Sequence, residues 1–341
     1  MIIMQSRDCQ IQKQRKRTGM NAALQKICEQ FIVNRDTIKN TLRLGSAYVY
    51  PQCANLFCSR NMQADEEQLR ACQQVLKERT GAFSSFRGVM QLPAICLLAM
   101  EQNPELKMEQ AVQAYETARQ QFSFSNQLAL AVFFMPSDIN MNQIAARAKE
   151  LHRRMKKDHP FLTSAEDSVV AMMMACVPRT DDQLLEDLES CYQLLKERFG
   201  ASNHVQTAAQ VLALAAGDPC QKTQHFLDLY DAIGQFGGKY GKYSELAPLA
   251  ALSLMSENVR QTASEIMDAD AFLDKQKGYG FWGMGKKMRL MHAAMLVSDL
   301  YALNNTASAQ TQDTVTIMMI AQCLATSSII IASNAAIAAA T

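Results

Sequence analysis

The sequence predicts an all-α protein, an α-α superhelix of solenoid type in which about six helix pairs stack side by side. Three observations favour this fold class. The chain has 341 residues, of which 48% are hydrophobic and 20% are charged, so it can bury a full core. Glycine (14) and proline (8) are sparse, whereas sandwiches and barrels need many turn residues. A pattern with a period of about forty residues also runs along the chain.

The repeat is visible as a matched segment and as a regular spacing of rings. LKERTGA at residues 76–82 and LKERFGA at residues 195–201 agree at six of seven positions, and they lie 119 residues apart. That offset is close to three repeats. An aromatic or imidazole ring recurs at intervals of 37, 40 and 38 residues, at Tyr115, His152, Tyr192 and Tyr230. Each ring lies in a stretch with the i, i+3, i+4, i+7 spacing of an amphipathic helix.

Short, almost wholly apolar segments separate these amphipathic stretches. They are PAICLLAM (93–100), LALAVFFM (128–135), VVAMMMA (169–175), VLALAAG (211–217) and LAPLAALSLM (246–255). A helix that is apolar on all sides is buried. We therefore expect each unit to pair one amphipathic helix with one buried helix, with six pairs between about residues 64 and 302. A compact helical bundle with accidental periodicity is the alternative.

Three regions follow from this division. Residues 1–20 are expected to be a frayed basic segment, residues 21–312 the helical-repeat domain, and residues 313–341 an uncharged helix of small residues. A helical region at about 21–58 flanks the pairs on the N-terminal side. Proline, glycine and acidic residues separate the units, as expected where one helix stops and the next begins.

Neither end of the chain predicts a membrane protein. The first residues lack the apolar core of a secretory signal. The uncharged run 315–333 is long enough to cross a bilayer, but polar residues interrupt it and no Lys or Arg flanks it, so membrane association through it is not expected. The ten cysteines include no C-x-x-C pair, which favours free thiols, no structural zinc and a cytoplasmic location.

The joints that lead from a buried helix to the next amphipathic helix are acidic. Their charged residues are Glu101, Glu105, Asp138, Asp181, Asp182, Asp218 and Glu257, with Arg179 as the cation. Acidic residues at helix N-termini satisfy free N–H groups and suit the helix dipole. We therefore expect a structural role for these joints and no binding site.

The opposite joints, from amphipathic to buried helix, are basic and carry aromatic residues. Their cations are Arg87, Lys156, Lys157, Lys239, Lys242, Lys277, Lys286 and Lys287, against the single acid Asp158. Dipole effects at helix C-termini explain Lys156 and Lys157, but not the cations that follow a helix break. The sequence thus favours a basic rim that binds an anionic ligand or a protein partner. Its candidate binding residues are Arg87, Lys239, Lys242, Lys286, Asn203 and Trp282.

Two motifs suggest chemistry. GFWGMGKK (280–287) nearly fits a phosphate loop, but Lys287 replaces the hydroxyl residue and no strand precedes it, so we expect a flexible joint. In HPFLTSAED (159–167), Thr163 and Glu166 fit a capping box ahead of the apolar run. The functional alternative makes His159, Glu166 and Asp167 a metal-assisted or acid/base site. No metal-ligand spacing or catalytic elbow is present, so no metal or cofactor is expected.

Several joints together resemble one known family. FSSFRG (83–88), YQLLKERFGASNHVQ (192–206), KYGKYSELAPL (239–249) and DKQKGYGFWGMGKKMRLMHAAMLVSD (274–299) are similar to the uncharacterised bacterial domain-of-unknown-function family 4003. The resemblance runs from about Leu24 to the C-terminus. It implies a helical protein of about this length and assigns neither an activity nor catalytic residues.

The function expected from the sequence is that of a cytoplasmic helical-repeat protein, a binding or scaffold module that uses the basic, aromatic-bearing rim. The alternative is an enzyme centred on His159, Glu166 and Asp167. Lys plus Arg (34) and Asp plus Glu (33) nearly cancel, and no nucleic-acid recognition module is present, so a nucleic-acid partner lacks support.

Overall fold

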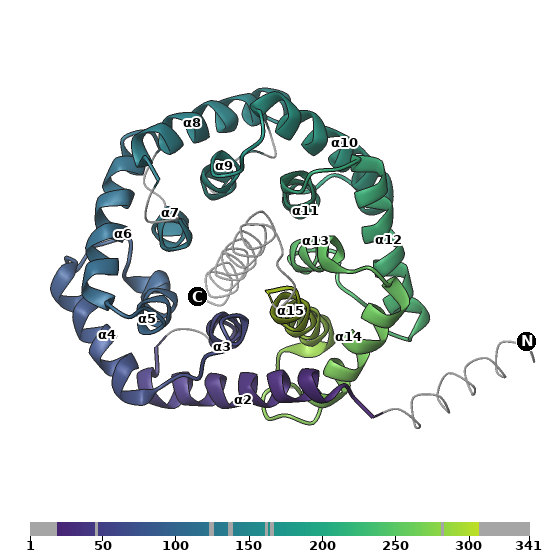
Figure 1. Cartoon of the computed structure of the whole chain (residues 1–341), viewed down its shortest axis with the longest axis horizontal. Helices are drawn as coiled ribbons and strands as arrows, with labels where there is room; N and C mark the ends of the chain where they lie inside the picture. The colour runs from purple at the N-terminus through teal and green to yellow at the C-terminus, as the bar shows by residue number, and fades with distance from the viewer. Residues whose placement is uncertain are drawn as a thin grey trace, which may run out of the picture.

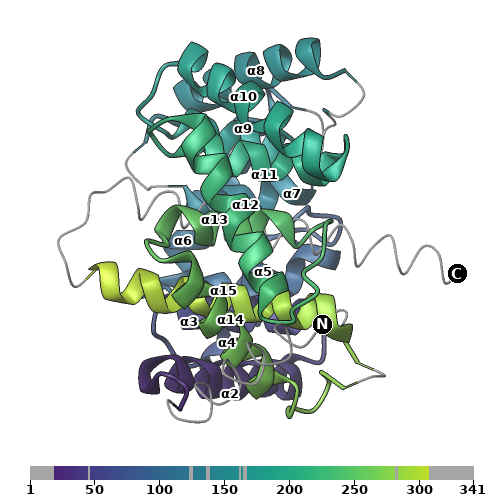
Figure 2. The same cartoon turned by 90° about the vertical axis from the view of Figure 1, so that its right-hand side faces the viewer.

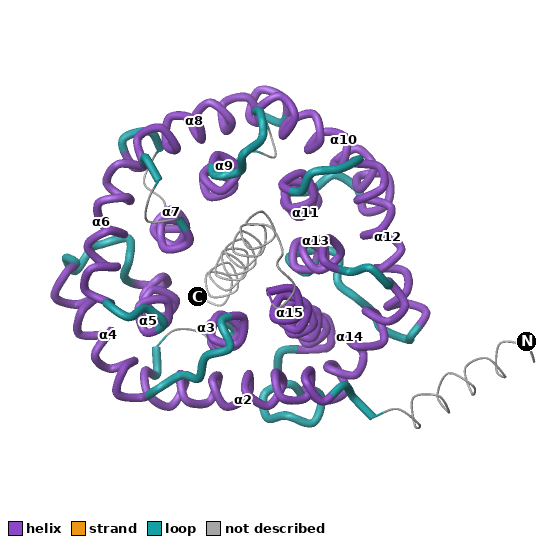
Figure 3. Tube along the Cα trace, viewed as in Figure 1, coloured by secondary structure: helices purple, strands orange, loops and turns teal. Residues whose placement is uncertain are grey.

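The computed structural model describes residues 19–44, 47–122, 126–135, 139–160, 163, 167–280 and 283–306. Within these ranges the chain forms helices and loops and contains no strand (Figure 3). The helices lie in two concentric rings (Figure 1). Residues 1–18 and 307–341 lie outside the described residues; they include most of the expected segment 1–20 and all of the expected helix 313–341, so the predicted domain boundaries stay a prediction.

The chain alternates between the two rings. The outer helices are α2 (Ala22–Leu42), α4 (Glu66–Arg79), α6 (Pro104–Arg119), α8 (Met141–Asp158), α10 (Asp181–Phe199), α12 (Pro219–Gln235) and α14 (Val259–Leu273). The inner helices are α3 (Val49–Ser59), α5 (Gln91–Ala99), α7 (Asn126–Ala131), α9 (Ser168–Ala175), α11 (Asn203–Leu214), α13 (Leu246–Met255) and α15 (Gly285–Thr306). Two short 3₁₀ turns, η1 (Gly88–Met90) and η2 (Val132–Phe134), adjoin α5 and α7.

The predicted stack of helix pairs is confirmed, and the structure adds its closure. Helices α4 to α15 form the six expected pairs, and the N-terminal flank forms a further pair, α2 with α3. That pair packs against α4 and α5 on one side and against α14 and α15 on the other. The superhelix therefore returns on itself as a ring, which Figure 2 shows from the side of α10, α12 and α14.

The two rings differ in burial as their sequences predict. Every residue of α9 is buried, and so is nearly every residue of α5. The outer helices bury one stripe, as α10 does with Leu184, Leu188 and Leu195. The inner helices are therefore shielded from water on all sides, whereas the outer helices are shielded on one side only.

The outer helices all begin with a side-chain cap. In each, a side-chain oxygen atom of the capping residue accepts a hydrogen bond from a backbone N–H group in the first turn. The capping residues are Asn21, Asp65, Asn103, Asn140, Thr180, Asp218 and Asn258. Among the inner helices whose N-cap residue is described, only α11 has a side-chain cap, which Ser202 provides. The expected capping box of Thr163 and Glu166 stays a prediction, because Glu166 lies outside the described residues. The described part of α9 begins at Ser168, and Asp167 before it makes no side-chain cap bond. Thr163 donates its hydroxyl to the Met155 carbonyl.

The aromatic and imidazole side chains that recur about every forty residues have a structural role. In four successive units, a ring at the end of one outer helix or in the joint after it packs edge-on against a ring of the next outer helix. The pairs are Phe86–Tyr115, Phe122–His152, His159–Tyr192 and Phe199–Tyr230, with ring centroids 5.4, 5.8, 4.7 and 5.0 Å apart. We call these contacts the ring locks. The recurrence near forty residues thus marks contacts between neighbouring units.

The ring closes through buried polar groups. Between α3 and α15, Asn55 donates to Asp299 (2.5 Å), and the Gln52 amide contacts His292 Nε2 (2.8 Å). The hydroxyl of Tyr279 lies 2.7 Å from His292 Nδ1. Burial, assisted by nearby Arg35, lowers the pKa of His292 to about 3. Burial also raises the pKa of Asp299 well above its usual value.

The first prediction concerns the ring locks. In a double-mutant cycle with Phe86→Leu and Tyr115→Leu, we expect a coupling of about 0.5–1.5 kcal/mol, because the edge-to-face contact adds to area burial. Chemical unfolding measures it. Phe86→Leu combined with Tyr192→Leu, from another lock, is the control and should be additive. Equal coupling in both cycles would contradict a pairwise lock.

The second prediction concerns the closure. Since the folded state keeps His292 neutral, its contribution to stability is present above pH 6.5 and is lost as the pH falls towards about 3. As the pH falls from 6.5 towards 3, the free energy of unfolding should decrease more steeply in the native protein than in His292→Gln. We expect the two slopes to differ by about 1.4 kcal/mol per pH unit. Asp299→Asn tests a pH dependence of the opposite sign. Folded Asp299 holds a proton that the unfolded chain releases above pH 3.8, so this group lowers the free energy of unfolding as the pH rises. Parallel pH profiles for the native protein and His292→Gln would refute this assignment.

Candidate binding rim

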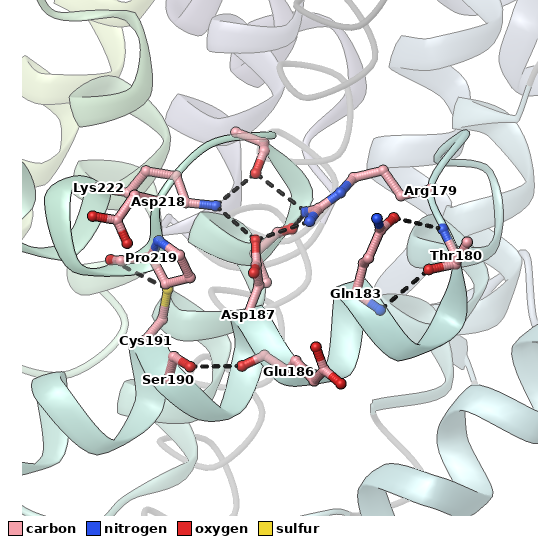
Figure 4. A network of polar contacts seen from close by, with 12 residues as sticks. Arg179, Thr180, Gln183, Glu186, Asp187, Ser190, Cys191, Asp218, Pro219 and Lys222 are labelled. Carbon is pink, nitrogen blue, oxygen red and sulfur yellow. Dashed lines mark hydrogen bonds and ion pairs between the residues drawn. The ribbon is translucent and has the colours of Figure 1, made fainter.

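The acidic joints are occupied by structural contacts, as the sequence predicts. Asp187 on α10 accepts from Arg179 (2.9 Å) and from Lys222 (3.1 Å), and all three side chains are largely buried (Figure 4). Both cations also donate to the carbonyl of Ala215, and Arg179 donates to that of Ala213 (2.6 Å). These carbonyls end α11, so the cluster caps the C-terminus of an inner helix.

The neighbouring joint repeats this arrangement one unit earlier. Arg147 on α8 donates to the carbonyls of Ala175 and Val177 at the end of α9 (3.0 Å each) and pairs with Asp181 (2.7 Å). Four of the other acids of these joints also pair or cap: Asp182 with Arg154, Glu101 with Arg60, Glu105 with Arg79, and Asp218 with the Cys220 N–H. Glu257 is exposed and forms no ion pair with a described residue. Asp138 lies outside the described residues. These contacts explain the acidic joints without a ligand.

Arg87 differs from the other candidate cations of the basic rim. Its guanidinium donates to the carbonyls of Lys77 (2.7 Å) and Thr80 (2.6 Å) and to the Thr80 hydroxyl (3.0 Å). It therefore caps the C-terminus of α4, and its donors are directed at the protein itself. The structure gives Arg87 a structural role, which makes it a poor probe of binding.

The loop between α12 and α13 presents two free cations. Lys239 and Lys242 are exposed, and neither forms an ion pair with a described residue. The only acid of the loop, Glu245, is buried and accepts the N–H of Tyr243 (2.9 Å). Its carboxyl packs on Gly241, where a Cβ atom would lie 2.1 Å from Glu245 Cδ. The close approach holds the acid inside and leaves the lysines outside.

The start of α15 adds cations beside this loop. Lys286 and Lys287 are exposed in its first turn, and Lys287 Nζ lies 5.9 Å from the ring centroid of Tyr243. A cation in the first turn opposes the helix dipole at a cost of about 0.3–1 kcal/mol. Together Lys239, Lys242, Tyr243, Lys286 and Lys287 form what we call the basic sector of the rim.

Asn203 and His204 border the basic sector. Asn203 is exposed at the first position of α11, and the ring of His204 packs against Tyr243 with centroids 5.7 Å apart. Burial lowers the pKa of His204, although Glu245 opposes the shift. Trp282, the remaining candidate, lies outside the described residues.

The most exposed aromatic side chains also lie in the outer-to-inner joints. Phe83 is 99% exposed in the joint after α4, and Tyr243 is 52% exposed in the basic sector. Tyr48, at the start of α3, is 38% exposed. The sequence places these aromatic residues in the joints, but it does not distinguish them from the aromatic residues that form the ring locks. Which of them are exposed depends on packing against the neighbouring unit, and the sequence alone does not show that packing.

The described residues of the motif at residues 159–167 contact two different helices. His159 Nε2 lies 2.6 Å from Glu189 on α10, and its ring forms a lock with Tyr192. Although burial opposes it, hydrogen bonds from Gln193 and His159 lower the pKa of Glu189. Asp167 instead accepts from Gln210 on α11 (3.2 Å). Glu166 lies outside the described residues, so the predicted triad stays a prediction.

The glycine-rich segment before α15 folds on itself. The N–H of Gly283 donates to Gly280 (2.8 Å), and that of Met284 donates to Gly278 (3.0 Å). These two N–H groups are therefore not free to bind phosphate, and the preceding element is a helix. Among the described residues, no three His, Cys, Asp or Glu side chains gather as a metal site would require.

Fold and rim together define a class: a helical-repeat protein closed into a ring, an α/α toroid with structural acidic joints. The chain belongs to the family described as protein of unknown function (DUF4003), whose family model matches residues 34–334. No curated protein and no solved structure matches the chain. In the part of the chain that the structure describes, every helix is too short or too polar to cross a bilayer.

The third prediction separates structural from free cations. We expect Arg87→Ala to lower the free energy of unfolding by about 1–2 kcal/mol, because three acceptors at the end of α4 lose their donor. Lys239→Ala, an exposed change in the same kind of joint, should stay within about 0.5 kcal/mol of the native protein. Urea unfolding of both variants is the measurement. Equal effects of the two changes would contradict the distinction.

Proposed function

We propose that this protein is a binding module whose basic sector docks an acidic segment of a protein partner. The observation that carries the proposal is the contrast between the two kinds of joint. In the acidic joints most charges are paired or cap a helix, whereas Lys239, Lys242, Lys286 and Lys287 have no ion partner among the described residues. Unpaired cations at one place on a chain whose net charge is close to zero support the binding of an anionic partner at that place.

The exposed rings support a protein segment as the partner. Tyr243 lies between the lysines of the basic sector, and Phe83 extends from another joint of the same kind. Aromatic side chains contribute much of the energy of protein interfaces, while charges steer association and select the partner. An acidic segment that carries an apolar side chain would use both features. A scaffold role at this rim requires no cofactor.

The enzymatic alternative rests on His159, Glu166 and Asp167 and has less support. The described contacts direct His159 to α10 and Asp167 to α11. His159 also fills the lock position that Phe86, Phe122 and Phe199 occupy in other units. A packing role explains why a ring stands at this position.

The fourth prediction tests the basic sector with a defined probe. A fluorescein-labelled peptide with one tryptophan among glutamates should bind the full-length protein, as measured by fluorescence anisotropy. We expect Lys239→Glu, Lys242→Glu and Lys286→Glu together to weaken binding at least tenfold, about 1.4 kcal/mol. Raising the salt concentration should weaken native binding in the same direction, because these charges are exposed.

The control reverses three exposed lysines on outer helices, Lys26, Lys149 and Lys196, so that the net charge changes equally. This variant should bind the peptide like the native protein. Equal weakening by both triple variants would show a general charge effect and contradict the proposal. Tighter binding of a single-stranded oligonucleotide or of polyphosphate than of the peptide would also contradict it.

A further inference from the structure

A polar pocket lies at the joint that leads from α4 to α5. Figure 1 shows this pair of helices across the ring from α12 and α13, whose joint carries the basic sector. The pocket has a volume of about 320 Å³. Small-molecule sites in proteins have volumes of about 300–1,000 Å³, so a small ligand fits. Every residue that lines the pocket belongs to the described range 47–122.

The lining of this pocket is cationic and rich in amide groups. It consists of three cations, three glutamines and one leucine, and none of these described residues is acidic. The cations are Arg70 and Lys77 on α4 and Arg87 in the joint, and the glutamines are Gln73, Gln74 and Gln91. Most ligand pockets are lined predominantly by apolar side chains. This lining instead suits a ligand that is itself charged and polar.

Two of the three cations have no carboxylate to neutralise them. Arg70 pairs with Glu66, one turn earlier on α4. Lys77 is exposed and Arg87 is half-buried, and neither forms an ion pair with a described residue. The nearby acid Glu78 does not line the pocket and accepts from Gln74 instead (2.6 Å). The excess of two positive charges matches a phosphate monoester, whose charge is about −1.5 to −2 at pH 7.

The guanidinium of Arg87 is fixed in position by the protein. Nε donates to the Thr80 hydroxyl, and Nη2 donates to the carbonyls of Lys77 and Thr80. Nη1 forms no hydrogen bond with a described residue, so its N–H groups remain for a ligand. Arg87 therefore combines its capping role with a place in the pocket wall. A cation that is already ordered loses little entropy when it binds an oxyanion.

The glutamines indicate what the rest of the ligand carries. Gln73 and Gln91 are half-buried, and neither side chain forms a hydrogen bond with a described residue. A carboxamide both donates and accepts hydrogen bonds, as a hydroxyl group does, so the two groups are well matched. Leu76 is the one apolar residue of the lining. The pocket therefore favours a ligand with several hydroxyl groups and little apolar surface.

We propose that this pocket binds a small phosphate monoester with a hydroxyl-rich body, a ligand of the sugar-phosphate class. Arg87, Lys77 and Arg70 hold the phosphate group, because arginine and lysine form strong charge-assisted hydrogen bonds with phosphate oxygens. Gln73 and Gln91 bind the hydroxyl groups. The site is independent of the proposed partner binding, because no residue of the basic sector takes part.

The test is a calorimetric titration of the full-length protein in a buffer without phosphate. The probes are the esters of phosphate with the primary hydroxyl of glycerol, ribose and glucose, each compared with inorganic phosphate and with the unphosphorylated compound. We expect at least one ester to bind once per chain and about tenfold or more tightly than either comparison compound. If no ester binds up to millimolar concentration, or if inorganic phosphate binds as tightly as the esters, the proposal is overturned.

A matched pair of variants makes the test specific. Lys77→Gln removes one exposed charge of the pocket and should weaken binding of the ester about tenfold or more, because a hydrogen bond to a charged group is lost. The control is Lys196→Gln, since Lys196 is also exposed and has the same place in LKERFGA as Lys77 has in LKERTGA. It lies outside the pocket, so this variant should bind the ester like the native protein. Unchanged affinity in Lys77→Gln, or equal weakening in both variants, would overturn the site.

Discussion

No helix pair of this protein can bury its own apolar surface, and the rest of the structure depends on that constraint. The inner helices α5 and α9 are buried almost completely, so each needs neighbours on both sides as well as an outer helix. Lateral contact between units is therefore the main source of stability. The ring locks, such as Phe199 on Tyr230, add a directional contact to this nonspecific burial.

The charged residues divide according to the same constraint. Where an inner helix ends, its carbonyls are enclosed by the neighbouring unit and need donors. Arg147 on α8 supplies them at the end of α9, and Arg179 in the joint before α10 supplies them at the end of α11. The loop that leads from outer helix α12 into inner helix α13 is longer than the joint that leads from α13 to α14. There Lys239 and Lys242 point to solvent, while Glu245 is folded inside.

Much of the fold follows from the sequence because it rests on local patterns. The apolar run at Val169 and the spacing of Leu184, Leu188 and Leu195 define the helices of one unit without further information. Closure does not follow, because it depends on the small rotation between units, which no local pattern encodes. The same limit applies to the rim: Arg87 and Lys239 look alike in sequence, and only the fold directs Arg87 to the end of α4.

Closure also has an evolutionary consequence. An open solenoid can gain or lose a unit at either end, because the last unit has only one neighbour to satisfy. Here the first pair, α2 with α3, packs against α14 with α15, so none of the described units is terminal. Insertion or deletion of one unit would change the circumference and misalign the remaining interfaces. The number of units is thus a fixed property of this closed architecture.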